Sequence, residues 1–144
     1  MSARSLPHLA CFIDTNVWLY AFMASADPRK RQLAHALIRR ERQIVVSTQV
    51  VNEVAVNLLK KAAFGEEQLR ALIRSFYRRY QVVAFDAGML GHASELRERQ
   101  QLSFWDSLIV ASALASGAQT LYSEDMQDGL IVEGRLTIVN PFAP

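Results

Sequence analysis

The sequence predicts an α/β fold, a three-layer α/β/α sandwich built on a mostly parallel sheet. Short apolar runs alternate with longer stretches of helical periodicity, and strands separated by helices form parallel crossover units. No linker rich in Gly, Ser or Pro divides the chain. Its 144 residues are 51% hydrophobic and 21% charged, a size and composition typical of one globular domain. We therefore expect a single domain over residues 1–144.

Five short apolar runs, each bounded by polar residues or turn formers, predict the strands. Runs that are apolar throughout are typical of strands buried on both faces of a parallel sheet. In chain order the predicted strands are Leu9–Ile13, Ile44–Val46, Val82–Phe85, Thr120–Tyr122 and Leu136–Val139. Because parallel strands point the same way, their carboxyl ends are expected to share one edge of the sheet.

Five stretches with apolar residues at helical spacing lie between these runs. Asp27 and Ser103 are placed to cap the first and last of them, and Gly65 and Gly117 follow the second and the last. The predicted helices are Arg29–Arg42, Thr48–Ala63, Glu66–Tyr80, Asp86–Gln100 and Ser103–Ser116. A further short helix is expected after the first strand, with Asp14 or Thr15 as its capping residue.

The net charge of +2 conceals a strong asymmetry. Residues 1–80 hold 13 Lys+Arg against 6 Asp+Glu, whereas residues 81–144 hold 3 against 8. In the basic half, Arg70, Arg74 and Arg78 form a row at i, i+4 spacing on one helix. Such a row can contact an RNA backbone, and it can equally be a solvated outer helix face. Both interpretations stay open.

Several classes of protein are disfavoured. No apolar run is long enough to span a bilayer and no signal-peptide pattern is present, so we expect a cytoplasmic protein without a membrane partner. Cys11 is the only cysteine, which rules out an intramolecular disulfide and a thiolate metal site. The sequence has no phosphate-binding glycine motif and no nucleophile elbow, and His8, His35 and His92 lack ligand spacing. Nucleotide cofactors, hydrolase triads and zinc are therefore not expected.

Four acidic residues stand close to the carboxyl ends of predicted strands, where ligands bind in parallel α/β sheets. Asp14 directly follows the first strand and Asp125 follows the fourth. Glu53 lies one turn into the helix after the second strand, and Asp106 lies in the first turn of the last helix. Each has a structural explanation when taken alone, as a helix cap, a turn residue or an exposed helix residue.

Together, however, four carboxylates at one edge of a sheet repel one another unless a cation binds there or their protonation shifts. An all-oxygen site favours a hard divalent ion, either Mg²⁺ or Mn²⁺. Such an ion can orient and acidify an attacking water and neutralise charge on a phosphodiester. The acidic residues and the basic half of the chain therefore favour metal-dependent chemistry on a polyanion.

The segments around these four acids strongly resemble the motifs of PIN-domain ribonucleases. They are FIDTNV at Phe12–Val17, VNEV at Val51–Val54, FWDSLIVASA at Phe104–Ala113 and LYSEDM at Leu121–Met126. The likeness covers nearly the whole chain and keeps the order and spacing of all four motifs. The chain length and the IVNPF ending at Ile138–Phe142 are similar to those of VapC-type toxins of bacterial type II toxin–antitoxin pairs.

The resemblance implies a PIN-like fold and a metal-dependent endoribonuclease that uses Mg²⁺, with Mn²⁺ able to substitute. By this likeness Asp14, Glu53 and Asp106 are core acidic ligands and Asp125 is the fourth acid, all four serving catalysis through the metal. Whether one or two ions bind is left open.

Two details of the implied site concern its supporting residues. Asn16 or Ser123 is expected to hold the site through hydrogen bonds. Glu124 and Asp128 flank Asp125 in the same acidic loop, so the identity of the fourth acid stays open; its place in the motif favours Asp125.

The resemblance further implies an RNA substrate, a homodimer and a small protein antitoxin that wraps the active-site groove. Three alternatives remain: a housekeeping RNA-processing nuclease of the same family, a non-catalytic nucleic-acid-binding domain and a magnesium-binding signalling domain. A receiver-type signalling domain would have a lysine after one of its last strands. The lysines here are Lys30, Lys60 and Lys61, all in the first half of the chain, which disfavours this alternative.

Four aromatic residues could stack on nucleobases: Trp18, Tyr20, Phe22 and Trp105. Aromatic side chains near helix starts more often pack in the core, where they bury a large apolar area. We therefore expect these four residues in the core and do not count them in the site.

Overall fold

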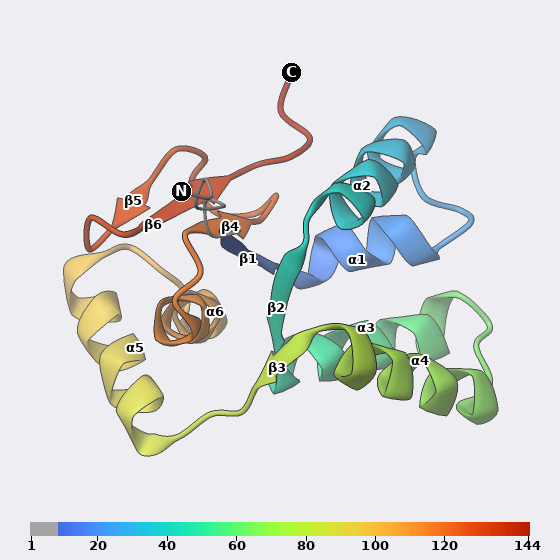
Figure 1. Cartoon of the computed structure of the whole chain (residues 1–144), viewed down its shortest axis with the longest axis horizontal. Coiled ribbons are helices and arrows are strands. Elements are labelled where there is room, and N and C mark those ends of the chain that lie inside the picture. The colour runs from blue at the N-terminus through green and yellow to red at the C-terminus, as the bar shows by residue number, and fades with distance from the viewer. Residues whose placement is uncertain (1–8) are drawn as a thin grey trace, which may run out of the picture.

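The computed structural model describes residues 9–144. The predicted domain of residues 1–144 thus includes eight residues that lie outside the described ones, and with them His8. The described elements follow one another as β1 (Ala10–Ile13), α1 (Thr15–Phe22), α2 (Pro28–Arg40), β2 (Gln43–Ser47), α3 (Thr48–Lys61), α4 (Glu66–Arg79), β3 (Gln81–Val83), α5 (Ala87–Arg99), α6 (Phe104–Ser116), β4 (Thr120–Tyr122), β5 (Ile131–Val132) and β6 (Leu136–Val139) (Figure 1).

The sheet has the strand order β3-β2-β1-β4-β6-β5. Every neighbouring pair is parallel except β5 and β6, which confirms the predicted mostly parallel sheet. β1 lies in its middle, with Cys11 opposite Ile44 of β2 and Phe12 opposite Leu121 of β4. The carboxyl ends of these three strands therefore lie next to one another.

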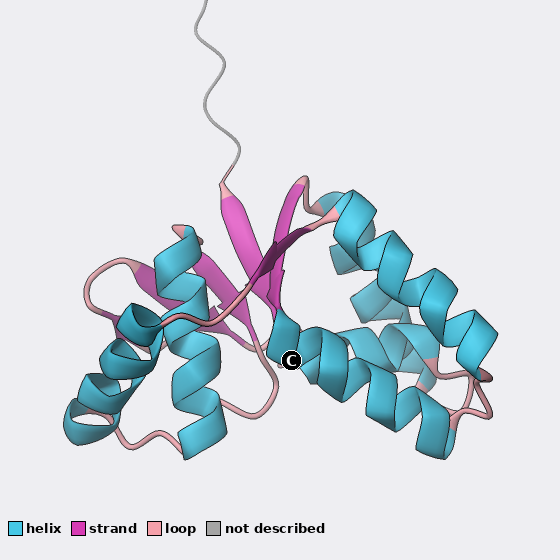
Figure 2. Cartoon of the chain, turned by 90° about the horizontal axis from the view of Figure 1, so that it is seen from below, coloured by secondary structure: helices cyan, strands magenta, loops and turns pink. Residues whose placement is uncertain are grey.

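Helices cover both faces of the sheet, as the three-layer prediction requires (Figure 2). Helices α1 to α4 lie on one face, and α5 packs with α6 on the other (Figure 1). The chain steps from β1 to β2 to β3 in one direction and then returns past β1 to β4, so right-handed crossovers place the last two helices on the opposite face. The reversal makes the gap between β1 and β4 a topological switch point, the usual ligand site of such sheets.

An aromatic cluster holds α1 against α4. Trp18 is 1% exposed, and its ring centroid lies 4.9 Å from that of Phe76 and 5.1 Å from that of Tyr80. Phe22 stacks on the same indole at 5.9 Å, and the indole N–H donates to the Ile13 carbonyl at 3.1 Å. The expectation that Trp18 is a core residue is confirmed. Its packing anchors the junction between β1 and α1.

The structure differs from the sequence-based prediction mainly at the ends of elements. Asp27 and Ser103 cap their helices as expected, and α2 and α3 end two residues before the predicted limits. The two-residue strand β5 was not predicted, because a run this short carries no periodicity. It joins β6 through a turn in which Glu133 and Gly134 have φ of 53° and 65°. Among residues 9–144, no helix is both long and apolar enough to cross a membrane.

Candidate active site

Asp14 links the carboxyl ends of β1 and β4. It is the N-cap of α1, and its carboxylate accepts a hydrogen bond from the Thr15 backbone N–H at 2.8 Å. The Ser123 hydroxyl, one residue beyond β4, donates to the other carboxylate oxygen at 2.9 Å. The Asp14 backbone N–H also donates to the Tyr122 carbonyl at 3.0 Å. Asp14 therefore sits buried at the switch point, in contact with Ser123.

Glu53 reaches the same place from the second turn of α3. Its carboxylate accepts hydrogen bonds from the Thr15 hydroxyl at 2.9 Å and from the Gln49 side-chain amide at 2.8 Å. Thr15 thus touches two of the four predicted acids. Neither Thr15 nor Gln49 was among the predicted site residues, although Thr15 lies between Asp14 and Asn16 and Gln49 lies one helical turn before Glu53.

Asp106 and Asp125 complete the group from the other side of the switch point. Asp106 lies in the first turn of α6, where its backbone N–H donates to the capping Ser103 hydroxyl at 3.1 Å. The Asn16 amide donates to the Asp125 carboxylate. The two supporting residues expected from the sequence therefore contact two different acids, because Ser123 holds Asp14 and Asn16 holds Asp125.

The other two acids of the loop after β4 have partners elsewhere. Glu124 accepts hydrogen bonds from the Tyr20 hydroxyl and forms an ion pair with the Lys30 ammonium, both at 2.5 Å. Asp128 accepts the backbone N–H of Asn140 at 2.8 Å and so stabilises the segment after β6. Among the described residues of this loop, Asp125 raises the pKa of Asp106 through its charge, whereas Glu124 and Asp128 do not contribute to that shift.

The four carboxylates form one electrostatic cluster. The pKa of Asp14 is raised to about 6, chiefly by burial and in part by the nearby charges of Asp106 and Glu53, while the hydrogen bonds from Thr15 and Ser123 oppose the shift. Burial also raises the pKa of Asp106, with the charges of Asp125 and Glu53 adding to it. Carboxylates whose charges disfavour one another in this way form an environment that a cation stabilises.

The donor chemistry of the cluster fits a hard divalent ion, since it offers carboxylate and hydroxyl oxygens and no sulfur or imidazole. Within the described part of the chain, however, no three His, Cys, Asp or Glu side chains already stand close enough together to hold a metal ion. Glu53 and Asp125 are turned instead toward Thr15, Gln49 and Asn16. Ion binding therefore requires these side chains to turn toward one another.

The sequence profile of the PIN domain family, described as PIN domain, matches residues 11–127. The chain belongs to the PIN domain family. The matched segment includes all four acids and both supporting residues, which confirms the family resemblance drawn from the four motifs. Among curated proteins no sequence matches the chain significantly.

Solved structures share the fold of this PIN domain. It is similar to the toxin VapC20 of Mycobacterium tuberculosis, a sarcin–ricin loop cleaving toxin, with 23% identity, a TM-score of 0.64 and coverage of 80% of this chain and 89% of that one. It is also similar to a chain of a toxin–antitoxin complex from Klebsiella pneumoniae, with 21% identity, a TM-score of 0.67 and coverage of 91% and 97%. FitAcB from Neisseria gonorrhoeae matches with 16% identity, a TM-score of 0.63 and coverage of 92% and 98%.

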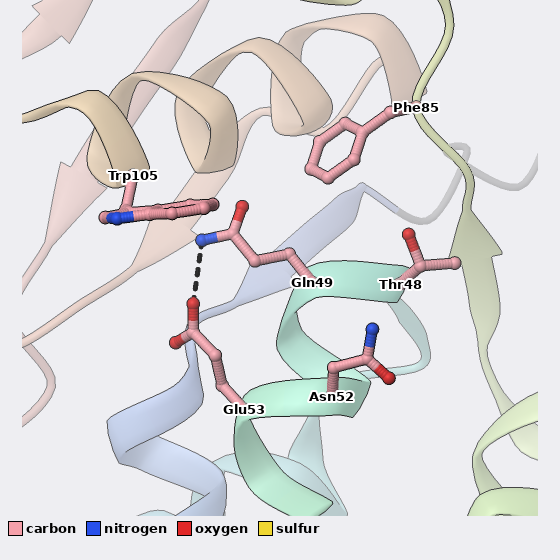
Figure 3. Close-up of a pocket in the computed structure, with 6 residues that line it drawn as sticks. All are labelled: Thr48, Gln49, Asn52, Glu53, Phe85 and Trp105. Carbon is pink, nitrogen blue, oxygen red and sulfur yellow. Dashed lines mark hydrogen bonds between the residues drawn. The ribbon is translucent and has the colours of Figure 1, made fainter. Parts of the chain in front are cut away.

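Beside Glu53, this PIN domain has an open cavity of about 480 Å³. Helix α3 contributes one side of the cavity, and Trp105 of α6 and Phe85 from the segment after β3 contribute the other (Figure 3). Trp105 is 61% exposed, so the expectation that it packs in the core is wrong. It lies in the first turn of α6, where its ring meets that of Phe104, itself 53% exposed, with the ring centroids 5.2 Å apart. The lining is completed by Thr48, Gln49, Asn52 and Glu53.

The predicted arginine row of the PIN domain lies on α4, the helix that packs against α3 (Figure 1). Arg70, Arg74 and Arg78 are all exposed. Their position agrees with either interpretation from the sequence, and contact with RNA stays a prediction.

Proposed function

We propose that this PIN domain is a divalent-metal-dependent endoribonuclease, a phosphodiester hydrolase, that acts as the toxin of a type II toxin–antitoxin pair. The nuclease assignment rests on the cluster of Asp14, Glu53, Asp106 and Asp125 at the switch point. Burial, together with the charges of acidic neighbours, raises the pKa of both Asp14 and Asp106, and raised carboxylate pKa values at a ligand-binding edge are typical of functional sites.

These four carboxylates would hold Mg²⁺, with Mn²⁺ able to substitute. A bound ion supplies positive charge to the phosphodiester and lowers the pKa of water in the site. In the reaction, a water oxygen forms a bond to phosphorus while the bond from phosphorus to the 3′ oxygen breaks. The products carry a 5′-phosphate and a 3′-hydroxyl.

Three consecutive residues organise the acids. Asp14 is itself an acid of the cluster, Thr15 donates both to Asp14 and to Glu53, and Asn16 donates to Asp125. One short segment at the start of α1 thereby orients two carboxylates from other parts of the chain, Glu53 of α3 and Asp125 of the loop after β4. Such supporting hydrogen bonds keep ligand oxygens in place and tune their basicity.

The toxin assignment draws on relatives of the same fold. The Mycobacterium tuberculosis relative is a toxin that cleaves the sarcin–ricin loop, and the Klebsiella pneumoniae relative is part of a toxin–antitoxin complex. We extend to this chain an RNA substrate, a small protein antitoxin, assembly as a homodimer and action in the cytoplasm. The basic N-terminal half supplies positive charge for RNA.

The proposal is tested by incubating the purified full chain with a structured RNA pool in Mg²⁺, in Mn²⁺ and in EDTA. Asp14→Asn keeps the shape of the side chain and removes its charge. Asp128→Asn is the matched control, because the carboxylate of this acid from the same loop accepts the Asn140 backbone N–H after β6 and lies outside the acid cluster. We expect specific cuts that require the ion, persist in Asp128→Asn and vanish in Asp14→Asn. Cuts that persist in EDTA or in Asp14→Asn would contradict the assignment.

The toxin role needs a separate test in bacterial cells. Induced expression of the wild-type chain should arrest growth, and expression of Asp14→Asn at the same level should not. Normal growth with active nuclease in the cell extract would instead favour a housekeeping role in RNA processing. If the purified protein does not cut, intact mass spectrometry of the preparation will reveal whether a small inhibitor has copurified.

A further inference from the structure

We propose that the cavity beside Glu53 is a nucleobase subsite that holds a base next to the scissile phosphodiester. The proposal rests on the ribonuclease function proposed above. It assigns to this cavity a class of ligand, a flat ring that carries an amino group, and it assigns to Trp105 and Gln49 the roles of stacking and hydrogen bonding.

Two aromatic side chains flank the cavity from different elements. Trp105 comes from α6, and Phe85 comes from the segment that leads from β3 to α5 (Figure 3). An indole that is 61% exposed beside a mostly apolar cavity leaves a large π-face for a partner. Bases of single-stranded nucleic acids stack on such aromatic faces. The walls therefore suit a planar ring.

Gln49 provides the second and independent observation. The residue is only 8% exposed, and its amide Nε2 donates to the Glu53 carboxylate at 2.8 Å. That hydrogen bond orients the amide, so Oε1 faces away from Glu53, and this oxygen is buried without a partner among residues 9–144. Figure 3 shows it directed to the space between Trp105 and Phe85. A buried acceptor without a donor costs free energy, which a ligand N–H would recover.

The chemistry of the lone acceptor selects among bases. Adenine, cytosine and guanine present an amino group on the Watson–Crick edge, which can donate to Gln49 Oε1. Uracil presents one ring N–H between two carbonyl oxygens, and these would face the amide oxygen. The surrounding side chains cover Oε1 in this conformation, so the base reaches it when the exposed Trp105 indole moves. A volume of about 480 Å³ lies within the range of small-molecule sites.

The position of the cavity connects it to the reaction. Glu53 lines the cavity and belongs to the carboxylate cluster, so a base seated here places its own phosphate beside the acids. A protein side chain from a partner could also enter an aromatic cavity. The acceptor Gln49 Oε1, which is unpaired among residues 9–144, and the continuity of the cavity with the acid cluster favour RNA as the occupant. The experiment below distinguishes RNA from a partner protein.

The test measures binding without cleavage, in the full chain carrying Asp14→Asn and in the presence of Mg²⁺. Fluorescently labelled hexanucleotides of cytidine or uridine are titrated with protein, and affinity is read from anisotropy. We expect the cytidine hexamer to bind about 10-fold more tightly than the uridine hexamer, and Trp105→Ala to weaken cytidine binding about 10-fold. Trp105→Phe should restore most of the affinity. Leu90→Ala, which removes an exposed apolar side chain outside the cavity, should change nothing.

Intrinsic fluorescence gives a second readout. The chain has two tryptophans, and Trp18 is buried in the core. Quenching by unlabelled cytidine hexamer should therefore come from Trp105 and be absent in Trp105→Ala. Gln49→Met should keep the quenching but remove the preference for cytidine over uridine, because methionine keeps the length of the side chain and lacks the amide acceptor.

Equal affinity for the two hexamers together with unchanged binding by Trp105→Ala would overturn the proposal, and it would direct attention to a protein occupant. That result leaves the nuclease assignment untouched if wild-type protein still cuts RNA and Asp14→Asn does not. The converse result, stacking of the cytidine hexamer on Trp105 without any metal-dependent cleavage by wild-type protein that mass spectrometry shows to be free of a copurified inhibitor, would overturn the nuclease assignment and retain the cavity as a base-binding site.

Discussion

The Thr15 hydroxyl donates to the Glu53 carboxylate at 2.9 Å across 38 positions of sequence. The bond joins the first residue of α1 to the second turn of α3, and the backbone N–H of the same threonine donates to Asp14. One residue therefore sets the spacing between two carboxylates that come from different elements, the N-cap of α1 and the second turn of α3. No other contact in the described residues joins these two acids through a single residue.

Removing the Thr15 hydroxyl should weaken metal use while leaving the fold intact. Thr15→Val keeps the shape of the side chain and the backbone donor to Asp14, but Glu53 loses one of its two side-chain donors. We expect the Mg²⁺ concentration for half-maximal cleavage to rise about 10-fold or more, in line with losses of supporting contacts at metal sites. Thr15→Ser should recover the wild-type value. An unchanged Mg²⁺ dependence in Thr15→Val would show that Thr15 does not position Glu53.

The protein without metal should become less stable as pH rises through the range in which Asp14 ionises. Because burial and the neighbouring carboxylates raise the pKa of Asp14 to about 6, the native state holds this proton over a pH range in which the unfolded chain has released it. The free energy of unfolding therefore falls as pH rises from about 4 to about 6 and levels off above that. Asp14→Asn should remove this fall and be more stable at pH 7 by on the order of 2–3 kcal/mol. Urea unfolding of the wild type and of Asp14→Asn in EDTA, at a series of pH values, measures this pH dependence of the unfolding free energy.

Divalent ions should stabilise the native state through the acid cluster. An ion that binds only the folded protein raises the midpoint of thermal unfolding with concentration. We expect this rise for the wild type with Mg²⁺ and with Mn²⁺, and little or none for Glu53→Gln or Asp106→Asn. Asp128→Asn should behave as wild type. If all four proteins respond alike, the ion binds outside the cluster.

The arginine row on α4 can be tested through the salt dependence of RNA binding. If Arg70, Arg74 and Arg78 contact phosphates, their joint replacement by glutamine should weaken RNA binding. Each phosphate contact on a single strand contributes roughly 0.7 to the slope of the logarithm of the binding constant against the logarithm of the salt concentration, so the loss of three contacts should reduce the magnitude of this slope by about 2. Arg135→Gln, in the acidic half of the chain, serves as the control. A slope equal to that of the wild type would mean that the row is a solvated helix face.

The two tryptophans should respond to truncation in opposite ways. Trp18→Ala leaves a large cavity among Phe22, Phe76 and Tyr80 and should cost about 3–5 kcal/mol of unfolding free energy. Trp105→Ala removes a largely exposed ring and should cost less than about 1 kcal/mol. Chemical denaturation of both variants checks the difference. A large loss in Trp105→Ala would indicate that the ring is structural rather than available to a ligand.

The fold was predictable because its signals are local. Short apolar runs, capping residues such as Asp27 and Ser103, and the glycine after α6 mark the elements through interactions within a few residues. The strand β5 escaped because two residues carry no pattern, and its pairing depends on a turn with positive φ at Glu133 and Gly134. The positions of the four acids along the elements were also predictable, since Asp14 and Asp125 follow strands and Asp106 and Glu53 lie in the first two turns of helices, and the ends of these elements have local signals.

The sequence by itself determined the α/β class, the family motifs and the four acids, because strand ends, helix caps and motif order are properties of neighbouring residues. Only the tertiary structure decided which side chains meet across long separations. Asp125 faces the acid cluster because Tyr20 and Lys30, from two helices on one face of the sheet, engage the adjacent Glu124. Trp105 lies exposed beside Gln49 because α6 and α3 bring them to the same cavity, an arrangement that helical periodicity does not encode.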